Sequence, residues 1–467
     1  MDFDALLQKD PYVFEGPAPE NIEGSEVGLR VINADKLWKM GITGEGRLVM
    51  NIDTGVEGTH PAFSSRWRGN FVPANQAWFD PETNTTTPTD CDDHGTHTMG
   101  IMTGRAGTDT IGVAFDAQWI AAKTICSSPH TSKSISAFQW ALNPDGNPNT
   151  IGDMPDVISN SWYDPNATDE CTGIYKQTFD ALEAAGIAIV FSAGNQGPNS
   201  STITKPKNIN TNEVNVFAVG NINGNSAGYP IANSSSRGPS TCGGTGSLLI
   251  KPEVVAPGTS VRSAVRGGGY ATMSGTSMAA PHVAGAIALL KQVFPDLTGT
   301  QLKYALYNTA VDLGDPGEDN TYGKGLIDVY AAFLYLANRD SVPPTQITNL
   351  QVSETGSNHI KLTWTAPFDN SPGGVTAYDI RYTTTGPILD TIAFNNAIKI
   401  LNVPNPDSAG KPQSIIINNL AFNTTYYFAI RSRDVWNNWS LISNSVSGTT
   451  LSKQSISHLF LLHFQSQ

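Results

Sequence analysis

The sequence predicts an α/β domain with a parallel sheet flanked by helices, followed by a separate all-β sandwich. The first observation is a series of short, continuous apolar runs between residues 37 and 335, separated by helix-like patterns. Such runs indicate strands buried on both faces, as in parallel sheets. The second is a change after residue 345 to alternating apolar and polar residues, which is typical of antiparallel sandwiches. The third is the length of 467 residues, which exceeds one ordinary core.

The first 340 residues are built from an arm and then from alternating strands and helices. Residues 1–35 contain three prolines and no clear period, and they are interpreted as a leading arm. A helix over Thr178–Ala185 runs directly into a strand, and strand–helix–strand order implies a doubly wound parallel sheet. The expected buried strands lie at residues 47–52, 117–122, 157–159 and 187–192.

The composition changes at Ser341–Thr345, where two consecutive prolines indicate a linker. Beyond it, apolar side chains recur at every second position, which predicts strands with one buried face. The alternating sets are Ile360, Leu362 and Trp364, then Tyr378, Ile380 and Tyr382, and then Tyr426, Phe428 and Ile430.

The net charge of -13 is concentrated in the first 342 residues, which hold 21 basic and 35 acidic residues. Because phosphate binding requires clustered Lys and Arg, this balance argues against a nucleic-acid partner. An acidic surface is compatible with bound Ca²⁺ and also with a simple role in solubility. The candidate carboxylate clusters are Asp90, Asp92 and Asp93, and Asp312, Asp315, Glu318 and Asp319. Neither has EF-hand spacing, and solvated loops are the simpler interpretation.

The four cysteines, Cys91, Cys126, Cys171 and Cys242, include no C-x-x-C pair. Zinc binding and dithiol redox chemistry are therefore not indicated. Two disulfides in any of three connectivities and four buried free thiols both remain open. No apolar stretch reaches the roughly 20 residues of a membrane span, and the first residues lack the pattern of a signal peptide.

A candidate nucleophile is Ser277, which precedes the small and apolar helical segment Met278–Lys291. A serine at a helix N-terminus usually acts as a cap, but the same position also offers free N–H groups to a developing oxyanion. Pro281 is expected in the first turn of this helix, where its missing N–H costs nothing.

Two further segments supply the partners that a serine nucleophile requires. Asp53 ends a predicted strand, where it is either a turn residue or a functional group, and His94 is followed by a glycine. A histidine base activates the serine, and a carboxylate fixes the tautomer of the base. The chain order Asp, His, Ser is that of subtilisin. Asn195, between Gly194 and Gly197, is a candidate oxyanion donor, although an Asn-Gly turn has the same composition.

These residues resemble the subtilisin-like serine peptidases over about 37–335. The segment Gly275–Gly285 is the most specific motif, and Asp53-Thr54-Gly55, His94–His97, Ser235–Pro239 and Lys251–Gly258 also resemble family blocks. Asn160-Ser161-Trp162 and Trp38 are similar to the bacillopeptidase F branch. The resemblance implies peptide-bond hydrolysis through an acyl-enzyme, secretion as a zymogen, no catalytic cofactor and often structural Ca²⁺. It assigns orientation of the base to Asp53, the base to His94, the nucleophile to Ser277 and the oxyanion donor to Asn195.

The same resemblance implies a groove for an extended substrate, lined by Ser161, Trp162, Ala193 and Gly194. The family commonly has glycine where this chain has Tyr163, so the shape of the primary pocket is in question. Residues 345–450 resemble a fibronectin type III domain, which acts either as a spacer, the favoured interpretation, or as a docking module. The expected division is a 1–36 arm or pro-domain remnant, a 37–340 peptidase domain, a 345–450 sandwich and a 451–467 tail.

The resulting expectation is an extracellular monomer without a membrane span, which acts on proteins or peptides. The chain is interpreted as a mature or truncated piece of a longer precursor, because no signal or pro-domain of normal size precedes residue 37. A second hypothesis is an inactive peptidase scaffold that binds through its sandwich domain. A third, a serine esterase of the α/β-hydrolase type, is disfavoured, since G-x-S-x-G and the order Ser, Asp, His are missing around Ser277.

Overall fold

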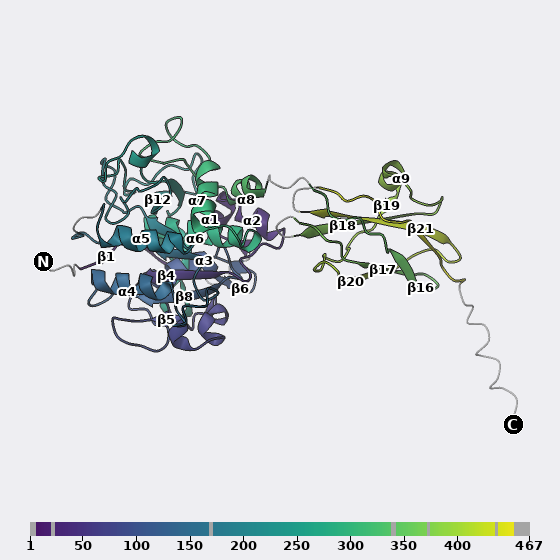
Figure 1. Ribbon diagram of the computed structural model, residues 1–467, viewed down its shortest axis with the longest axis horizontal. Coiled ribbons are helices and arrows are strands. Elements are labelled where there is room, and N and C mark those ends of the chain that lie inside the picture. Colours follow the sequence, from purple (N-terminus) through teal and green to yellow (C-terminus); the bar gives the residue numbers. More distant parts are fainter. Residues whose placement is uncertain are drawn as a thin grey trace, which may run out of the picture. The chain divides into compact units, whose positions relative to one another are not determined.

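The computed structural model describes residues 6–19, 24–167, 171–337, 342–370, 374–434 and 438–452. The chain divides into two compact units, Met1–Leu336 and Ala337–Gln467. The first unit contains the predicted α/β fold and the second contains the predicted sandwich (Figure 1). The fold class predicted from the sequence is therefore confirmed.

A seven-stranded sheet with the order β13-β12-β11-β9-β4-β8-β5 forms the centre of the first unit, and all its strand pairs are parallel. Every residue of β4, β9, β11 and β12 is buried, which explains why these strands read as continuous apolar runs. The strands are β4 (Leu48–Asp53), β5 (Trp78–Phe79), β8 (Gln118–Lys123), β9 (Val157–Asn160), β11 (Ala188–Ser192), β12 (Phe217–Ile222) and β13 (Val254–Pro257).

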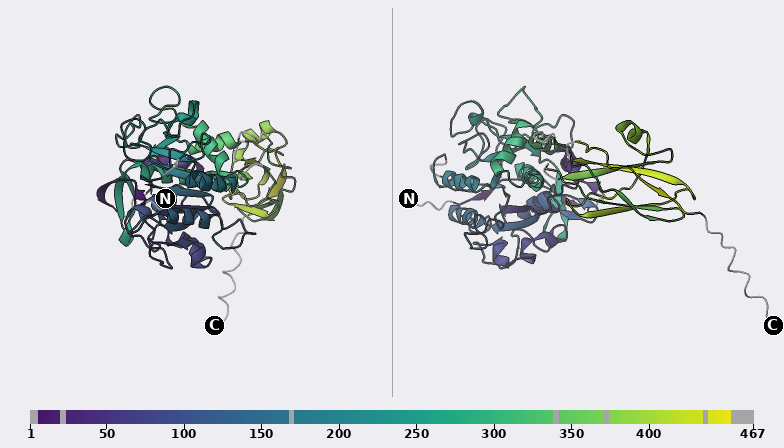
Figure 2. Two further views of the ribbon diagram at one scale, coloured as in Figure 1. Left: turned by 60° about the vertical axis from the view of Figure 1, so that its left-hand side comes forward. Right: turned by 45° about the vertical axis from the view of Figure 1, so that its right-hand side comes forward.

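Helices cover both faces of this sheet (Figure 2). On one face, Met50 and Ile52 pack in a single apolar cluster with Phe138 of α4 and Phe179 of α5. On the other face, Asn51 donates to the Gly95 carbonyl of α3, and α6 packs against α3 and the central strands. The helices of this unit are α1 (Val27–Val31), α2 (Ala34–Trp38), α3 (His94–Thr103), α4 (Thr131–Ala141), α5 (Ile174–Ala184), α6 (Thr276–Val293), α7 (Gly299–Asn308) and α8 (Val329–Ala337), with 3-10 turns at Ser64–Arg66, Arg68–Asn70, Ala74–Gln76, Gly246–Leu249 and Arg266–Gly268.

The described part of the N-terminal arm forms strands that join three different parts of the first unit. Strand β1 pairs antiparallel with β10, β2 adds to the β14–β15 hairpin, and β3 pairs with β7. This pairing was not predicted, because the arm has no apolar period of its own. The strands are β1 (Gln8–Lys9), β2 (Val13–Ala18), β3 (Gly24–Ser25), β6 (Arg105–Ala106), β7 (Asp109–Thr110), β10 (Trp162–Tyr163), β14 (Val261–Ala264) and β15 (Tyr270–Ser274).

The second unit is a sandwich of two antiparallel sheets, β16-β17-β20 and β19-β18-β21-β22. Its core includes Trp364, whose ring meets that of Tyr378 edge-on at 5.2 Å. The strict alternation of burial along β17 explains the period of two in its sequence. The elements are β16 (Gln351–Thr355), β17 (Ile360–Thr365), β18 (Val375–Thr383), α9 (Thr391–Asn396), β19 (Ile398–Lys399), β20 (Pro412–Ile417), β21 (Thr425–Asp434) and β22 (Val446–Thr449). The predicted tail lies outside the described residues from 453 onward.

The structure contains two disulfides, Cys91–Cys126 and Cys171–Cys242, which are one of the three connectivities that the sequence left open. No cysteine is free, which excludes the alternative of four buried thiols. The first bridge fastens the loop before His94 to the segment that follows β8. Within the described residues, no helix is long and apolar enough to cross a membrane.

Loss of the Cys171–Cys242 bridge by double replacement with serine is expected to lower the free energy of unfolding by about 4 kcal/mol, because the bridge closes a loop of 71 residues. Thermal unfolding of the double variant, compared with wild type under oxidising and reducing conditions, measures the effect. An unchanged midpoint under oxidising conditions would show that the bridge contributes nothing to stability.

Candidate active site

Asp53 and His94 meet at the carboxyl edge of the central sheet. Asp53 is the last residue of β4, and His94 is the first residue of α3. Nδ1 of the imidazole lies 2.7 Å from Oδ1 of Asp53, and both side chains are buried. The backbone N–H of Thr54 also donates to Oδ1 of Asp53 at 2.7 Å. The carboxylate therefore fixes the orientation of the ring and leaves Nε2 on its far side.

The pKa of His94 is raised above its ordinary value. Burial lowers this pKa, but the charge of Asp53 and its hydrogen bond outweigh the effect of burial. Because one neighbouring carboxylate stabilises the imidazolium, His94 is suited to accept a proton and to return it later.

A second carboxylate, that of the half-buried Asp90, ties together the segments that carry the pair. It accepts hydrogen bonds from the hydroxyls of Thr54 and Thr96 at 2.7 and 2.6 Å. Burial raises the pKa of Asp90 to about 7, although these hydrogen bonds lower it. At Gly95 a Cβ atom would lie 2.0 Å from the carbonyl oxygen of Gly55, so only glycine permits this approach. Asp90 thus positions the loop, a role that sequence reasoning did not find.

Ser277 lies in the first turn of α6, which packs against α3. Its Oγ and Nε2 of His94 are both buried, and neither has a hydrogen-bond partner in the described structure. The first-turn N–H groups of a helix have no intrahelical acceptor and point toward this end. The sequence placed Ser277 correctly at a helix N-terminus.

The predicted position of Pro281 in the first turn is wrong. The helix begins at Thr276, so Pro281 lies inside it. Its ring removes the N–H that would otherwise donate to the carbonyl of Ser277. The hydroxyl of Ser161 donates to that carbonyl at 3.3 Å instead, which links the helix to the predicted groove wall.

Asn195 follows β11, and both ends of its side-chain amide are hydrogen-bonded. Its Oδ1 accepts from the N–H of Thr276 at 2.9 Å, which fixes the side-chain orientation. Its Nδ2 donates to the carbonyl of Pro11 at 2.7 Å. The preceding Gly194 has φ of +108°, a conformation that a side chain would strain. Asn195 is therefore positioned to donate to a carbonyl oxygen that enters from the cleft.

The four predicted groove residues differ in whether they pair with the arm or with the rest of the domain. The carbonyl of Ser161 accepts from the N–H of Asp10, and Trp162 pairs with Lys9 while its indole is buried beneath the wall. Ala193 uses both backbone groups within the domain, and Gly194 donates to the hydroxyl of Thr276. Only the Ser161–Trp162 edge pairs with a chain that crosses the cleft.

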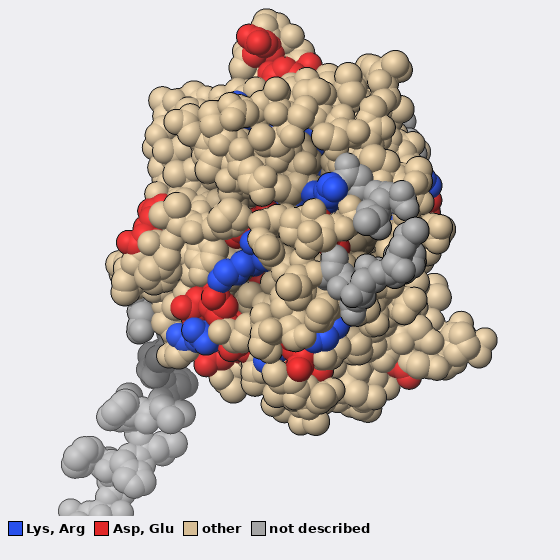
Figure 3. Space-filling view, turned by 90° about the vertical axis from the view of Figure 1, so that its left-hand side faces the viewer, with Lys and Arg blue, Asp and Glu red and all other residues tan. Residues whose placement is uncertain are grey.

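The chain that crosses the cleft is the protein's own N-terminal arm. The ring of Tyr12 lies 5.0 Å from that of His94, and its hydroxyl donates to Asp92 at 3.0 Å. The ammonium of Lys9 also pairs with Asp92, at 2.5 Å. With the arm in this position, His94 and Ser277 are fully buried. On the face of the molecule where β1 lies, basic and acidic side chains are interspersed (Figure 3).

The two carboxylate clusters considered for Ca²⁺ do not fit a metal site. In the first, Asp90 binds threonine hydroxyls, Asp92 pairs with Lys9, and Asp93 pairs with Arg266. In the second, Glu318 accepts from Ser247 and Tyr307. Within the described ranges, no group of three or more His, Cys, Asp or Glu is arranged to hold a metal ion.

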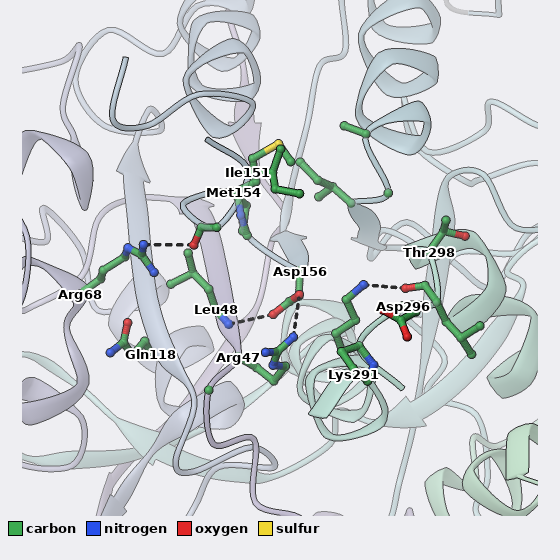
Figure 4. A pocket seen from close by; sticks show the side chains of 18 residues that line it. Arg47, Leu48, Arg68, Gln118, Ile151, Met154, Asp156, Lys291, Asp296 and Thr298 are labelled. Carbon is green, nitrogen blue, oxygen red and sulfur yellow. Dashed lines mark hydrogen bonds and ion pairs between the residues drawn. The ribbon is translucent and has the colours of Figure 1, made fainter. Parts of the chain in front are cut away.

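A separate cavity of about 500 Å³ lies at the opposite, amino-terminal edge of the sheet (Figure 4). Asp156 lies in it and accepts from the N–H of Leu48 at 2.9 Å, with Arg47 at 3.7 Å. Lys291 donates to the carbonyl of Leu297. Ligands of open α/β sheets bind at the carboxyl ends of the strands, so this cavity is not the candidate active site.

The parallel α/β sheet, the Asp53–His94 pair and a serine in the first turn of the neighbouring helix α6 are together typical of a serine hydrolase. Comparison with known proteins gives the family. Residues 44–325 match the model of the subtilase family, and residues 343–446 match the fibronectin type III domain. The chain belongs to the subtilase family and is a serine endopeptidase.

Two relatives show how far the similarity extends. The chain is 37% identical to bacillopeptidase F of Bacillus subtilis strain 168 over 334 residues, which are 66% of this chain and 22% of that protein. It is 34% identical to subtilisin E of the same strain over 333 residues, which are 70% of this chain and 77% of that protein. The matched region thus spans about a fifth of bacillopeptidase F and three quarters of subtilisin E.

Proposed function

We propose that this protein is an extracellular endopeptidase that cleaves proteins and peptides with the triad Asp53, His94 and Ser277. The observation that carries the proposal is the buried hydrogen bond of 2.7 Å between Asp53 and His94. His94 begins helix α3, which packs against α6, and the first turn of α6 holds Ser277 with its buried, unpartnered Oγ. Secretion is supported by two disulfides, which persist in oxidising compartments. We further propose the division into a 1–36 arm, a 37–340 peptidase domain, a 345–450 sandwich that acts as a spacer, and a 451–467 tail.

In the proposed reaction, Nε2 of His94 takes the proton of Ser277 Oγ as this oxygen attacks the carbonyl carbon of the peptide bond. Nδ2 of Asn195 and the backbone N–H of Ser277 stabilise the oxyanion that forms. His94 then protonates the leaving amine, and an acyl-enzyme remains. A water molecule, deprotonated by His94, hydrolyses the ester and restores Ser277. The side chain of Asp53 holds the imidazole in the required tautomer.

The arm must leave the cleft before a substrate enters, so the experiment compares wild type with a variant in which the arm is held less tightly. Labelling with a fluorophosphonate probe, followed by peptide mapping, is expected to place the probe on Ser277. The variant Asp10→Lys is expected to react about 10²–10³-fold faster than wild type, because the buried pair of Asp10 with Lys207 is broken. Breaking such a pair costs about 3–5 kcal/mol.

The matched control is Asp35→Lys, which makes the same charge change on α2, where the ion-pair partner of Asp35 among the described residues is the exposed Lys39. Its labelling rate is expected to equal that of wild type, since an exposed pair contributes little. If folded Asp10→Lys protein takes no label and does not cleave casein, the triad is not assembled. The hypothesis of an inactive binding scaffold would then be preferred.

A further inference from the structure

We infer that this peptidase prefers an acidic side chain on the residue before the cleaved bond, and that Lys207 is the specificity-determining residue. The inference rests on the proposed function and adds the class of substrate to it. Its basis is the way in which the arm occupies the cleft.

The arm lies in the cleft as an extended peptide substrate would. Strand β1 pairs antiparallel with β10, with Gln8 opposite Tyr163 and Lys9 opposite Trp162. Main-chain pairing of this kind holds an extended peptide irrespective of its sequence, and pockets then select among side chains. The N–H of Asp10 continues the pairing to the carbonyl of Ser161 at 3.3 Å. Asp10 is thus the last residue of the arm paired with this wall before the chain reaches Asn195.

The side chain of Asp10 is fully buried beside polar groups. Its Oδ2 accepts hydrogen bonds from the ammonium of Lys207 and from the hydroxyl of Ser192. Oδ1 is also buried and has no hydrogen-bond partner among the described residues. The pocket therefore binds a carboxylate through one cation and one hydroxyl.

Lys207 depends on the chain in the cleft for its counter-ion. In the described structure, the acidic group that pairs with its ammonium is Asp10, and the remaining hydrogen bond of Nζ is to Ser192. Lys207 is itself fully buried, and burial lowers its pKa while the charge of Asp10 raises it. A buried ammonium without a partner is costly. When the arm leaves, a substrate carboxylate is the group that restores the pair.

Tyr163 forms another part of this pocket. The ammonium of Lys207 lies 5.8 Å from the centroid of its ring, and its hydroxyl donates to Gln8 at 2.5 Å. The ring thus lies near the cation, and its hydroxyl contacts the arm that pairs with this wall. This position gives the tyrosine a role in shaping a pocket for a carboxylate.

In the arm, the oxyanion donor does not hold the carbonyl of Asp10. Nδ2 of Asn195 donates to the carbonyl of Pro11, one residue beyond Asp10. The arm therefore fills the acidic pocket while the oxyanion donor is occupied by the next carbonyl. It acts as an occupant of the cleft and not as the bond to be cut.

Fluorogenic peptides that repeat the arm sequence test the inference. The substrates are acetyl-Leu-Gln-Lys-X-coumarinylamides with X as Asp, Asn or Leu, and the enzyme is the full chain with Asp10→Ala, which leaves the pocket without its own carboxylate. We expect kcat/KM for Asp to exceed that for Asn and Leu by about 10²-fold or more, since a buried polar site rejects analogues that leave it unpaired.

Replacement of the cation in the same background, giving Asp10→Ala/Lys207→Met, is expected to reduce the preference for Asp over Leu at least 10²-fold. This pair of changes leaves no unpaired buried charge, so folding is preserved, and thermal unfolding checks it. The control is Lys205→Met, because this nearby lysine ammonium donates to the carbonyl of Ala167. Its preference should remain that of the parent.

Labelling of Ser277 by the fluorophosphonate probe separates the two levels of inference. If the label is present and Leu or Asn is preferred at X in the parent, the acidic preference is refuted while the proposed function stands. If the preference for Asp survives Lys207→Met, the assignment to Lys207 is refuted. If no variant takes the label, the proposed function itself fails.

Discussion

Replacement of Ser277 by alanine is expected to lower kcat for peptide hydrolysis by about 10⁶-fold, with little change in KM. This is the loss that removal of the serine nucleophile causes in a subtilisin. The physical reason is that no acyl-enzyme forms without Oγ, while the groove wall at Ser161 and Trp162 still binds the peptide. The residual rate comes from Asn195 and the helix N-terminus, which stabilise the oxyanion without a nucleophile.

Single-turnover and steady-state hydrolysis of a fluorogenic peptide measure this loss in the Asp10→Lys background, where the cleft is accessible. The double variant Ser277→Ala/His94→Ala should be no slower than Ser277→Ala within a few-fold, because the base has no other proton to take. The control is Ser200→Ala, an exposed serine in the loop after Asn195, which should retain full activity. Retention of a tenth or more of the rate by Ser277→Ala would contradict the assignment.

Replacement of Asp53 by asparagine is expected to lower kcat by about 10⁴-fold and to change its pH dependence. The magnitude is that found for the aspartate of serine protease triads. Burial lowers the pKa of His94, and the carboxylate of Asp53 is the main group that opposes it. Without the carboxylate, the pKa of His94 falls below its wild-type value. Since the neutral ring is the active base, the acid limb of the kcat profile should move to lower pH.

A pH–rate profile, combined with titration of the His94 ring by NMR, measures both effects. The control is Asp93→Asn, because Asp93 adjoins His94 in sequence but pairs with Arg266 at the surface. Its acid limb should coincide with that of wild type. An Asp53→Asn profile whose acid limb stays in place would mean that Asp53 does not set the pKa of His94.

Much of the fold followed from patterns that lie close together in the chain. The apolar runs that predicted buried strands correspond to β4, β8, β9 and β11. A strand that is covered on both faces carries apolar side chains on both, so its sequence is a continuous apolar run. The period of two predicted the sandwich strands because only one face of such a strand is buried. The placement of Asp53 at a strand end and Ser277 at a helix start also followed, because glycine and small residues mark those junctions.

The limits of local pattern appear at Pro281 and at the cysteines. Proline is common in first turns, but here a hydroxyl from Ser161 compensates for it inside the helix. The cysteine pairing depends on which loops lie side by side, and Cys91 meets Cys126 only because their segments adjoin. Asp90 was considered as a metal ligand, although the structure uses it to bind Thr54 and Thr96.

The sequence by itself determined the two domains' fold classes, the catalytic type and the candidates Asp53, His94, Ser277 and Asn195. The tertiary structure alone decided that the arm fills the cleft and that Lys207 pairs with Asp10. The two residues are 197 positions apart, and neither stands in a motif. The physical reason is that a buried ion pair depends on desolvation and on which chain segments meet, and neither is encoded in the spacing of neighbouring residues.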